Sequence, residues 1–302
     1  MTPPELTAVL VNYNAGDELR VALRSIADEM AEGSWEAFVV DNASLDGSAR
    51  IAQEFAPHTT LIANPQNVGF GRAVNQGLAR ARASRVLIMN PDCRLNAGAL
   101  AGLGAELDRH ERCALVGPRI FDPDGSVQGS ARGDPDMLTG LFGRSALLRR
   151  LLPSSGASRR NVVDESVAPG TSSVVVDWLS GACVLGRRDA LAEVQGFDER
   201  YFLYWEDADI CRRLRARGYH ARYVPSVSAV HHVGHSSRTA RASSIRAFHD
   251  SAYLYYATHV APGALNPKRL VARAILAARC WWLLRGASDT GPLVPPHAEE
   301  NR

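Results

Sequence analysis

Acidic residues that directly follow apolar runs are the first indication of chemistry in this 302-residue sequence. Asp41 opens the segment DNASLDGS after one such run, and Asp92 ends the segment NPD after another. A carboxylate at the end of a strand can accept the imide N–H of uracil or thymine, which suits Asp41. A carboxylate placed in the same way can hold Mg²⁺ or Mn²⁺ against a diphosphate, which suits Asp92. Each segment taken singly also fits an ordinary turn or helix start.

The segment NPQNVGFGRAVNQGL (64–78) predicts a helix start that binds phosphate. Gly69 and Gly71 let a ligand approach the backbone closely, and the helix N-terminus attracts anions. Arg72 can donate to a phosphate or to a base edge. The glycine spacing matches neither GxGxxG nor the P-loop, which argues against a dinucleotide site of that kind and against an ATPase. The alternative is an ordinary tight turn.

The segment GFDERYFLYWEDADICRRLRARG (196–218) predicts a helix with a carboxylate at the mouth of the core. Asp207 shares one helix face with the apolar residues Ile210, Cys211 and Leu214. Asp207 should therefore point inward, and the helix dipole favours its ionised form, as a base that deprotonates a sugar hydroxyl requires. A sugar ring would stack on the upstream aromatic residues, which are Tyr201, Phe202, Tyr204 and Trp205. The alternative is that the acidic turn only compensates the helix dipole and the aromatic residues belong to the core.

Two further segments carry residues suited to a ligand or a surface. VHHVGHSS contains His231, His232 and His235, one of which could complete a metal site with Asp92 or contact a diphosphate. A polar loop without a ligand is the alternative. In 267–285, basic residues alternate with Trp and Leu, which is typical of a helix on an anionic membrane. Packing on the domain, or on a second subunit in a homodimer, is equally compatible.

Short apolar runs alternate with helical patterns in the first half of the sequence. This predicts an α/β protein with a mostly parallel central sheet flanked by helices. The expected strands are Leu6–Val11, Phe38–Val40, Thr59–Ala63 and Val86–Met89, and the expected helices cover 19–30, 48–55 and 72–83. Ligands bind such sheets beyond the carboxyl ends of the strands, where the polar segments at 12–14, 41–44 and 90–92 fall.

The second half begins with a stretch rich in Gly, Ser and Pro at 130–172, which we expect to be a mobile insertion. Gly218 is expected to end the helix that carries Asp207. The elements expected beyond the insertion are strands at Val174–Leu179 and Cys183–Leu185 and helices at Glu206–Arg217, 243–259 and 267–285.

The composition is that of a globular enzyme. Apolar residues make up 46% of the chain and charged residues 22%, and the formal net charge of +2 argues against a nucleic-acid-binding surface. The five cysteines are scattered without a CxxC pair, as in a cytoplasmic protein with reduced thiols. The start, MTPPELTAVLVNYN, does not resemble a secretory signal, and no stretch approaches the ~18 apolar residues of a membrane span. We therefore expect a cytoplasmic protein, either soluble or peripheral at the inner face of the membrane.

The order of these segments resembles that of family-2 glycosyltransferases, which have the GT-A fold. The resemblance rests on NYN, DNxSxDGS, NxGFGRAxN, a strand ending in PD, WLSGA, GFDERYFLYWEDAD and HHxxHSS, over about residues 6–240. DPDGSVQGSAR, DWLSGACVLGRRDAL and VHHVGHSS are most similar to bacterial rhamnosyltransferases. Those enzymes use dTDP-L-rhamnose and commonly extend a polyprenyl-diphosphate-linked sugar. We accordingly expect a GT-A domain at 1–240, a C-terminal helical region at 241–290 and a disordered tail at 291–302.

Carried over residue by residue, the resemblance implies a base, a metal site, a nucleotide site and an acceptor site. Asp207 would be the catalytic base, and Asp92 with His231 would bind Mg²⁺ or Mn²⁺. The implied nucleotide-binding residues are Tyr13, Asp41, Ser44, Asn67, Arg72 and Asp92. The implied acceptor-binding residues are Trp178, Gly181, Trp205 and Glu206. Asn90 replaces the first acid of the family's DxD motif, a departure that bears on how tightly the metal is held.

These roles imply an inverting, metal-dependent transferase of cell-envelope glycan synthesis. Asp207 would take the proton of an acceptor hydroxyl, while the metal and basic groups neutralise the departing nucleoside diphosphate. The expected donor is dTDP-L-rhamnose and the acceptor a lipid-linked sugar or a polysaccharide, with a UDP-hexose or UDP-N-acetylhexosamine as the alternative donor. A sugar-phosphate nucleotidylyltransferase should carry a GxGxRxxP-like loop, which VNYNAGDEL lacks. A non-catalytic nucleotide-sugar sensor would lack Asp92 or Asp207.

Overall fold

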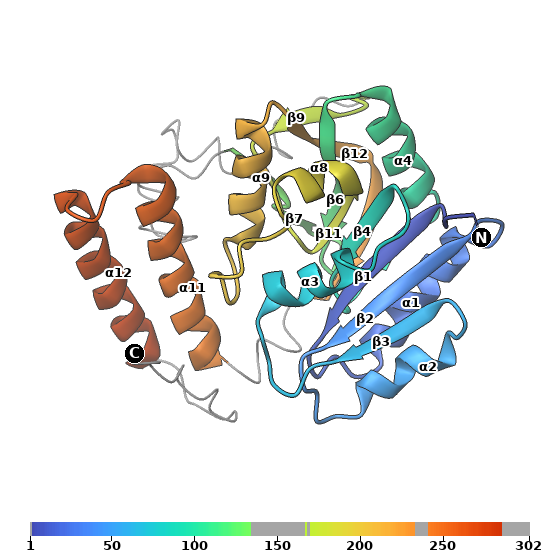
Figure 1. The fold of residues 1–302 in the computed structure, drawn as a ribbon, viewed down its shortest axis with the longest axis horizontal. Coiled ribbons are helices and arrows are strands. Elements are labelled where there is room, and N and C mark those ends of the chain that lie inside the picture. The colour runs from blue at the N-terminus through green and yellow to red at the C-terminus, as the bar shows by residue number, and fades with distance from the viewer. Residues whose placement is uncertain (1, 134–166, 168–169, 233–240, 286–302) are drawn as a thin grey trace.

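The computed structural model describes residues 2–133, 167, 170–232 and 241–285, and within them ten strands form one mixed sheet (Figure 1). These strands are β1 (Leu6–Asn12), β2 (Trp35–Asp41), β3 (Thr59–Ala63), β4 (Arg85–Met89), β5 (Cys93–Leu95), β6 (Cys113–Phe121), β7 (Val127–Gln128), β9 (Val174–Val176), β11 (Cys183–Arg187) and β12 (His220–His231). Their order is β3-β2-β1-β4-β11-β6-β12-β5, with β7 on β6 and β9 on β12. A second, small sheet joins β8 (Ala131–Arg132) to β10 (Trp178–Leu179).

Continuous apolar sequence explains the parallel part of the main sheet. All residues of β1 and β2 are buried, as in strands that helices cover on both faces. β1 lies parallel between β2 and β4, and β2 is parallel to β3, so the four strands expected in the first half are confirmed. β2 begins earlier than its apolar run because Glu36 is buried with Thr7 and Arg82 as partners.

Helices flank the sheet as expected, with two differences in their ends. The helices are α1 (Glu18–Glu29), η1 (Ser48–Arg50), α2 (Ile51–Glu54), α3 (Phe70–Leu78), α4 (Ala99–Arg109), α8 (Arg188–Glu193), α9 (Glu206–Ala216), α11 (Arg241–Tyr255), the π-helical η3 (Tyr256–Val260) and α12 (Pro267–Arg285). The helix expected at 72–83 ends at Leu78, because Arg80 and Ala81 donate to carbonyls three residues back in a tighter turn. The helix expected at 243–259 is divided between α11 and η3.

The second half of the sheet is partly antiparallel. β11 is antiparallel to both β4 and β6, whereas β12 is parallel to β6. The single strand expected at Val174–Leu179 is wrong: β9 pairs with β12, while β10 pairs with β8 after Asp177 donates its N–H to the Arg132 carbonyl. The local sequence patterns predicted no counterpart of α4 or β6. Most of the insertion expected at 130–172 lies outside the described residues, although its first part contains β8.

Three groups of buried side chains join these layers. One group lies between the sheet and α1 and α4, and another between the sheet and α3, α8 and α9. The third joins the loop before α9 to the C-terminal helices and contains Tyr201, Trp205, Ala208, Tyr255 and Leu276. α11 and α12 lie side by side, with α11 on the side of α9 and α12 farther from it (Figure 1). No helix in the described ranges is both long and apolar enough to cross a membrane. The tail expected at 291–302 lies outside those ranges.

Candidate active site

The residues singled out from the sequence gather along one edge of the main sheet. The parallel strands β1, β2 and β4 end at this edge, and β11 begins there because it is antiparallel to β4. β12 ends at the same edge, because it is parallel to β6, which is itself antiparallel to β11. The chain adds β2 and β3 on one side of β1 and then β4 on the other. Open α/β sheets bind ligands at such a reversal.

Asp41 and Ser44 lie together at the carboxyl ends of β1 and β2. The Asp41 carboxylate is 5% exposed and accepts hydrogen bonds from Asn12 Nδ2 at 2.7 Å and from the Ser44 N–H at 3.0 Å. Ser44 Oγ accepts from Asn12 Nδ2 at 3.1 Å and from the Asn14 N–H at 2.9 Å. The half-buried Tyr13 follows Asn12 directly. Both carboxylate oxygens of Asp41 therefore shape the turn, and each keeps a further lone pair that can accept.

Gly69 brings the loop before α3 against the loop before α9. Its φ is +89°, and a Cβ at this position would lie 2.5 Å from the Phe202 carbonyl oxygen, so only glycine fits. The N–H of Phe70 donates to the same carbonyl at 2.8 Å. On the other side, Asn67 Oδ1 accepts from the Gly69 N–H at 2.9 Å, and Asn42 Nδ2 donates to the Gly69 carbonyl at 3.2 Å. This glycine thus joins the Asp41 turn to the segment that precedes Asp207.

Arg72 occupies a more open position than the other predicted nucleotide residues. Its side chain is 58% exposed, and its Nε donates to Glu199 Oε2 at 3.0 Å. The structure therefore pairs the guanidinium with a carboxylate of the chain itself. A phosphate would have to share or replace that partner.

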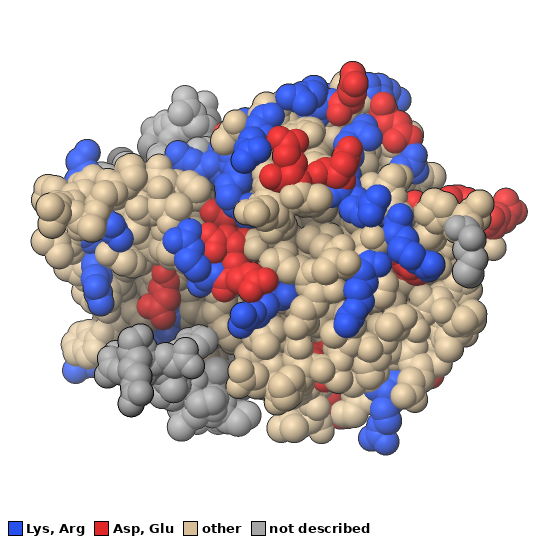
Figure 2. Space-filling view, viewed as in Figure 1, with Lys and Arg blue, Asp and Glu red and all other residues tan. Residues whose placement is uncertain are grey.

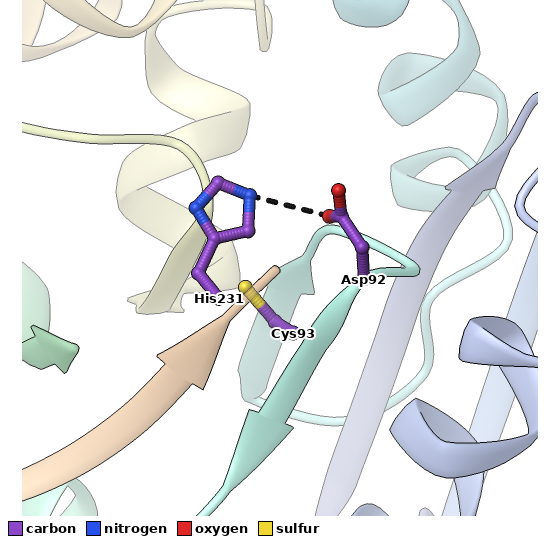
Figure 3. Close-up of side chains that lie close together, drawn as sticks. All are labelled: Asp92, Cys93 and His231. Carbon is purple, nitrogen blue, oxygen red and sulfur yellow. Dashed lines mark ion pairs between the residues drawn. The ribbon is translucent and has the colours of Figure 1, made fainter. Parts of the chain in front are cut away.

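Asp92 and His231 face one another across the ends of two strands (Figure 3). His231 ends β12 and lies opposite Cys93, the first residue of β5. Its Nε2 is 3.2 Å from Asp92 Oδ1, and the two side chains are only 12% and 14% exposed. Asp92, Cys93 and His231 each offer one ligand atom, and these atoms lie within 4.8 Å of one another. Burial raises the pKa of the Cys93 thiol well above its usual range, and its Sγ donates to the Ala182 carbonyl.

Gln128 orients His231, a role that no sequence pattern predicted. His231 Nδ1 is 2.9 Å from Gln128 Oε1, which can only accept, so Nδ1 carries the proton. Nε2 then accepts from Asn90 Nδ2 at 3.3 Å and lies 3.2 Å from Asp92 Oδ1, so a cation could bind between these two ligand atoms. Gln128 Nε2 donates to the His231 carbonyl at 2.9 Å and to Asp122 Oδ1 at 2.8 Å, which holds the amide in place. The only signal in the sequence is that Gln128 lies within DPDGSVQGSAR, one of the segments similar to rhamnosyltransferases.

The structure distinguishes His231 from its neighbour in the histidine cluster. His232 is 44% exposed and its Nδ1 contacts Glu18 Oε1 at 3.1 Å, so its ring is directed away from Asp92. Adjacent residues of a strand point to opposite faces, which explains the difference. His235, the third member of the cluster, lies outside the described residues.

Asp207 begins α9 beside the loop that precedes β11. Its Oδ2 accepts from the Gly181 N–H at 3.1 Å, and its Oδ1 accepts from the Ala208 N–H at 2.8 Å. The next residue, Ala182, accepts from the Asn90 N–H at 2.8 Å. Backbone contacts thus connect Asp207 through Gly181 and Ala182 to the strand end that carries Asp92. Asp207, the implied base, and Gly181, an implied acceptor residue, are thus in direct contact.

The neighbouring carboxyls Glu206 and Asp207 both have raised pKa values. Burial raises the pKa of Asp207, which opposes the helix-dipole effect expected from the sequence, while the N–H groups of Gly181 and Ala208 lower it. Burial and the charge of Asp207 raise the pKa of Glu206 well above its usual range. Glu206 Oε2 is buried and has no hydrogen-bond partner. The N–H groups of Gly181 and Ala208 favour the ionised form of Asp207, whereas the Glu206 carboxylate receives only its own backbone N–H. Glu206 is therefore the member of the pair that holds a proton more readily.

Asp209, the third acid of this turn, has a structural role. It is fully buried, and its carboxylate contacts Arg213 Nε at 2.7 Å and His259 Nε2 at 2.6 Å. His259 belongs to η3, so this ion pair ties α9 to the C-terminal region. The acidic turn is therefore not mere compensation of the helix dipole, because its three carboxyls have three different surroundings.

Trp178 and Arg132, on the paired strands β10 and β8, lie beside Asp207. Arg132 Cζ lies 5.0 Å from the centre of the Trp178 ring, and its charge lowers the pKa of Asp207 against the larger effect of burial. Trp178 Nε1 faces Asp207 without a partner of good hydrogen-bond geometry. Trp178 was expected here, whereas Arg132 was missed because it lies at the start of the segment expected to be an insertion.

The aromatic wall expected upstream of α9 is largely core. Tyr201 and Trp205 are 0% and 6% exposed, and Trp205 packs against Trp178 and against Tyr255 of α11. The expectation that a sugar stacks on Tyr201 is therefore wrong, because the C-terminal helices cover it. Trp205 has a φ of +70°, a strained value for a bulky residue, and this left-handed residue turns the chain into α9.

Comparison with known proteins gives the following matches. Residues 7–194 match the model of the family described as glycosyl transferase family 2, and residues 153–250 match glycosyl transferase family group 2. The chain is 34% identical over 296 residues to the N-acetylglucosaminyl-diphospho-decaprenol L-rhamnosyltransferase of Mycobacterium tuberculosis, covering 93% of this chain and 94% of that protein. It is 35% identical over 102 residues to rhamnosyltransferase WbbL of Escherichia coli, covering 34% of this chain and 38% of that protein.

Solved structures with a similar fold include two glycosyltransferase complexes. GalNAc-T7 with UDP, GalNAc and Mn²⁺ has a TM-score of 0.60 at 14% identity, covering 94% of this chain and 57% of that chain. The mannosyltransferase PcManGT from Pyrobaculum calidifontis, in complex with GDP-Man and Mn²⁺, has a TM-score of 0.52 at 20% identity. The match covers 95% of this chain and 80% of that chain. At these identities the similarity concerns the fold.

Proposed function

The chain belongs to glycosyl transferase family 2 and has the expected GT-A fold, and from this premise we propose that it transfers L-rhamnose from dTDP-L-rhamnose to a polyprenyl-diphosphate-linked sugar. The relative that aligns over almost the whole chain is named for an N-acetylglucosaminyl-diphospho-decaprenol acceptor. The observation that carries the proposal is the position of Asp207, held by the Gly181 N–H on the sheet edge where Asp92 and His231 meet. The same premise supports a cytoplasmic site of action in cell-envelope glycan synthesis.

The proposed reaction is a single displacement with inversion. The acceptor hydroxyl oxygen forms a bond to the anomeric carbon, the bond from that carbon to the diphosphate oxygen breaks, and the hydroxyl proton moves to Asp207. The raised pKa of Asp207 suits this role, because a base with a pKa nearer neutrality accepts a proton more readily than an ordinary aspartate. Arg132 stabilises the ionised form before the reaction.

Asp92 and His231 fit a divalent cation bound to the donor diphosphate. The donor set is one carboxylate oxygen and one imidazole nitrogen, which together favour Mn²⁺, while a carboxylate alone also suits Mg²⁺. Cys93 is a poorer ligand for these cations, because its thiol donates to the Ala182 carbonyl and because a soft sulfur ligand suits Mg²⁺ and Mn²⁺ less than oxygen does. When bound, the cation would neutralise the charge that develops on the leaving diphosphate.

The two substrates would meet at this edge from different sides. We assign the nucleotide to the turns that carry Tyr13, Asp41, Ser44 and Asn67, with Arg72 and Asp92 toward the diphosphate. We assign the acceptor to Trp178, Gly181, Trp205 and Glu206. The contact of the Gly181 N–H with Asp207 and the position of Trp178 Nε1 facing Asp207 support the acceptor assignment, because both groups lie beside the proposed base.

A donor panel tests the proposed function. The purified chain is incubated with a short-chain N-acetylglucosaminyl-diphospho-polyprenol, Mn²⁺ and one donor: dTDP-rhamnose, UDP-glucose or UDP-N-acetylglucosamine. Mass spectrometry of the product is expected to show one added deoxyhexose with dTDP-rhamnose only, and NMR the inverted anomer. If sugar were transferred only from a UDP donor, the donor would not be dTDP-rhamnose. Pyrophosphate exchange would favour a nucleotidylyltransferase, and binding without turnover a sensor.

Replacing Gln128 by Leu is expected to weaken Mn²⁺ binding by about 10- to 100-fold in the presence of dTDP. Leucine cannot accept the Nδ1 proton, so His231 loses its fixed tautomer and orientation. Isothermal titration calorimetry measures the metal affinity directly. Val127→Ser, a change at the exposed neighbouring residue of β7, is the matched control and should bind as the wild type does. Unchanged affinity of Gln128→Leu would exclude this orienting role.

Glu206→Gln is expected to stabilise the protein at pH 8 by on the order of 1 kcal/mol, with the gain disappearing toward pH 4. The folded pKa of Glu206 is raised above its unfolded value, so wild-type stability is greatest at low pH. It falls as the pH rises past the unfolded pKa, where only the unfolded chain ionises freely. Urea unfolding at both pH values measures the difference. The exposed Glu32→Gln is the control, and a parallel response of both variants would contradict the assignment.

A further inference from the structure

One face of α12 is apolar and exposed. Its members lie at helical spacing along the outer side of the helix and are Leu270, Val271, Ala274, Ala277, Ala278, Trp281 and Trp282. The large members are 74% (Leu270), 60% (Val271), 56% (Trp281) and 68% (Trp282) exposed. We call these seven residues the outer face of α12. A continuous exposed apolar surface of this kind is uncommon on a soluble protein unless something binds it.

The outer face takes no part in holding the helix on the protein. The opposite side of α12 carries the buried Ala272 and Leu276, which pack in the same group of side chains as Tyr201, Trp205 and Ala208. Ala208 directly follows Asp207. The inner side of α12 thus joins, through α11 and η3, the group of side chains that includes the start of α9, and its outer face is left for another contact.

The charges around the outer face are almost all positive. Lys268 and Arg273 are exposed at its two margins, and Arg285 lies at its end with Cζ 3.6 Å from the Trp281 ring. Residues 241–285 contain seven basic residues and one acidic residue, Asp250, a net charge of +6 in a chain whose total is +2. On the side seen in Figure 2, the surface that α11 and α12 form at the left is mainly tan, with scattered blue side chains and one red patch.

We propose that the outer face of α12 binds the surface of a membrane that contains anionic lipids. The apolar residues enter the boundary between headgroups and acyl chains, the two tryptophans lie at that boundary, and the flanking basic side chains reach the lipid phosphates. A second copy of this chain is a poorer partner, because the same face of a copy offers no acidic residue to the basic margins. The helix lies in the plane of the membrane, since its exposed apolar residues extend from Leu270 to Trp282 and basic residues flank them at both ends, Lys268 and Arg285.

This surface would bring the protein to its acceptor, an inference that rests on the proposed lipid-linked substrate. A polyprenyl chain stays in the bilayer while its diphosphate sugar extends into water. Because α12 packs on α11 and η3, whose side chains pack with those at the start of α9, docking of the outer face holds Asp207 at a defined distance from the membrane. Salt should weaken the attachment through the basic margins but not through the apolar residues.

Vesicle binding of the full chain tests the proposal. Wild-type protein is sedimented with vesicles of phosphatidylcholine alone or with one third phosphatidylglycerol. We expect at least about tenfold tighter binding to the anionic vesicles, with a blue shift of tryptophan emission. The double variant Trp281→Ser, Trp282→Ser is expected to bind at least about tenfold more weakly and to lose the blue shift, because Trp35, Trp178 and Trp205 lie within the protein.

Two controls distinguish this proposal from the proposed function. Val175→Ser removes an equally exposed apolar residue from β9 and should leave vesicle binding unchanged. Transfer to a water-soluble acceptor without a long polyprenyl chain should be the same for all variants, so loss of activity there would concern the enzyme and not the membrane contact. Equal vesicle binding by the double variant would overturn the proposal. The proposal would also be overturned if the wild type were a dimer in solution and the double variant a monomer.

Discussion

Replacement of Asp207 by Asn is expected to lower kcat for sugar transfer by about 10³-fold while changing the affinity for dTDP by less than about twofold. The amide cannot take the proton of the acceptor hydroxyl, and that proton moves only in the transition state. Its oxygen still accepts one of the two backbone N–H bonds, from Gly181 or Ala208, so the turn keeps its shape. Product formation under saturating donor and acceptor gives kcat, and calorimetry with dTDP gives the affinity.

Glu206→Gln is the matched control for this experiment, because Glu206 is the adjacent carboxyl of the same buried turn. If Glu206 already holds a proton, the neutral amide should keep kcat at saturating acceptor within about tenfold of the wild type, and a lost contact with the acceptor should appear in KM instead. The wild-type kcat should fall as the pH drops, starting above the usual range of an aspartate, because burial raises the pKa of Asp207. The base would have to be another residue if Asp207→Asn kept most of its kcat or if only Glu206→Gln lost it.

Replacement of Asp92 by Ala is expected to abolish the metal dependence of nucleotide binding. The wild type should bind dTDP about 10- to 100-fold more tightly with Mn²⁺ than with a chelator, since Asp92 supplies the charged ligand of the site. Without that carboxylate, His231 remains as a single neutral ligand, and it also loses its partner at 3.2 Å. Calorimetric titration of dTDP with and without Mn²⁺ measures the difference.

Cys93→Ala tests the third member of the same cluster. Because the buried Cys93 thiol donates to the Ala182 carbonyl, its loss should reduce stability while leaving the metal dependence intact. Thermal unfolding of both variants separates the two effects. Asp92 would not be a metal ligand if Asp92→Ala retained the full wild-type response to Mn²⁺. A loss of metal binding in Cys93→Ala would place the thiol among the ligands instead.

Local patterns in the sequence were sufficient for the sheet and for the edge that carries the site. A run such as LTAVLVN can be buried on both sides only in a strand covered by helices, and parallel strands bring their carboxyl ends to one edge. Asp41 and Asp92 could therefore be assigned to one end of the sheet from the sequence alone. The division of the strand at 174–179 could not be predicted from the sequence. Its two parts pair with β12 and with β8, which are far apart in the sequence.

The sequence by itself determined which residue types were available for the chemistry, and the order of its motifs indicated the family. The resemblance already implied Asp207 and His231, and the tertiary structure shows what separates each from its neighbours: His231 rather than His232 faces Asp92, and Asp207 rather than Asp209 lies beside Gly181. It also supplied Gln128, whose contact with His231 joins residues 103 positions apart. Such choices depend on the register of distant strands, which packing of the whole core sets and no local pattern encodes.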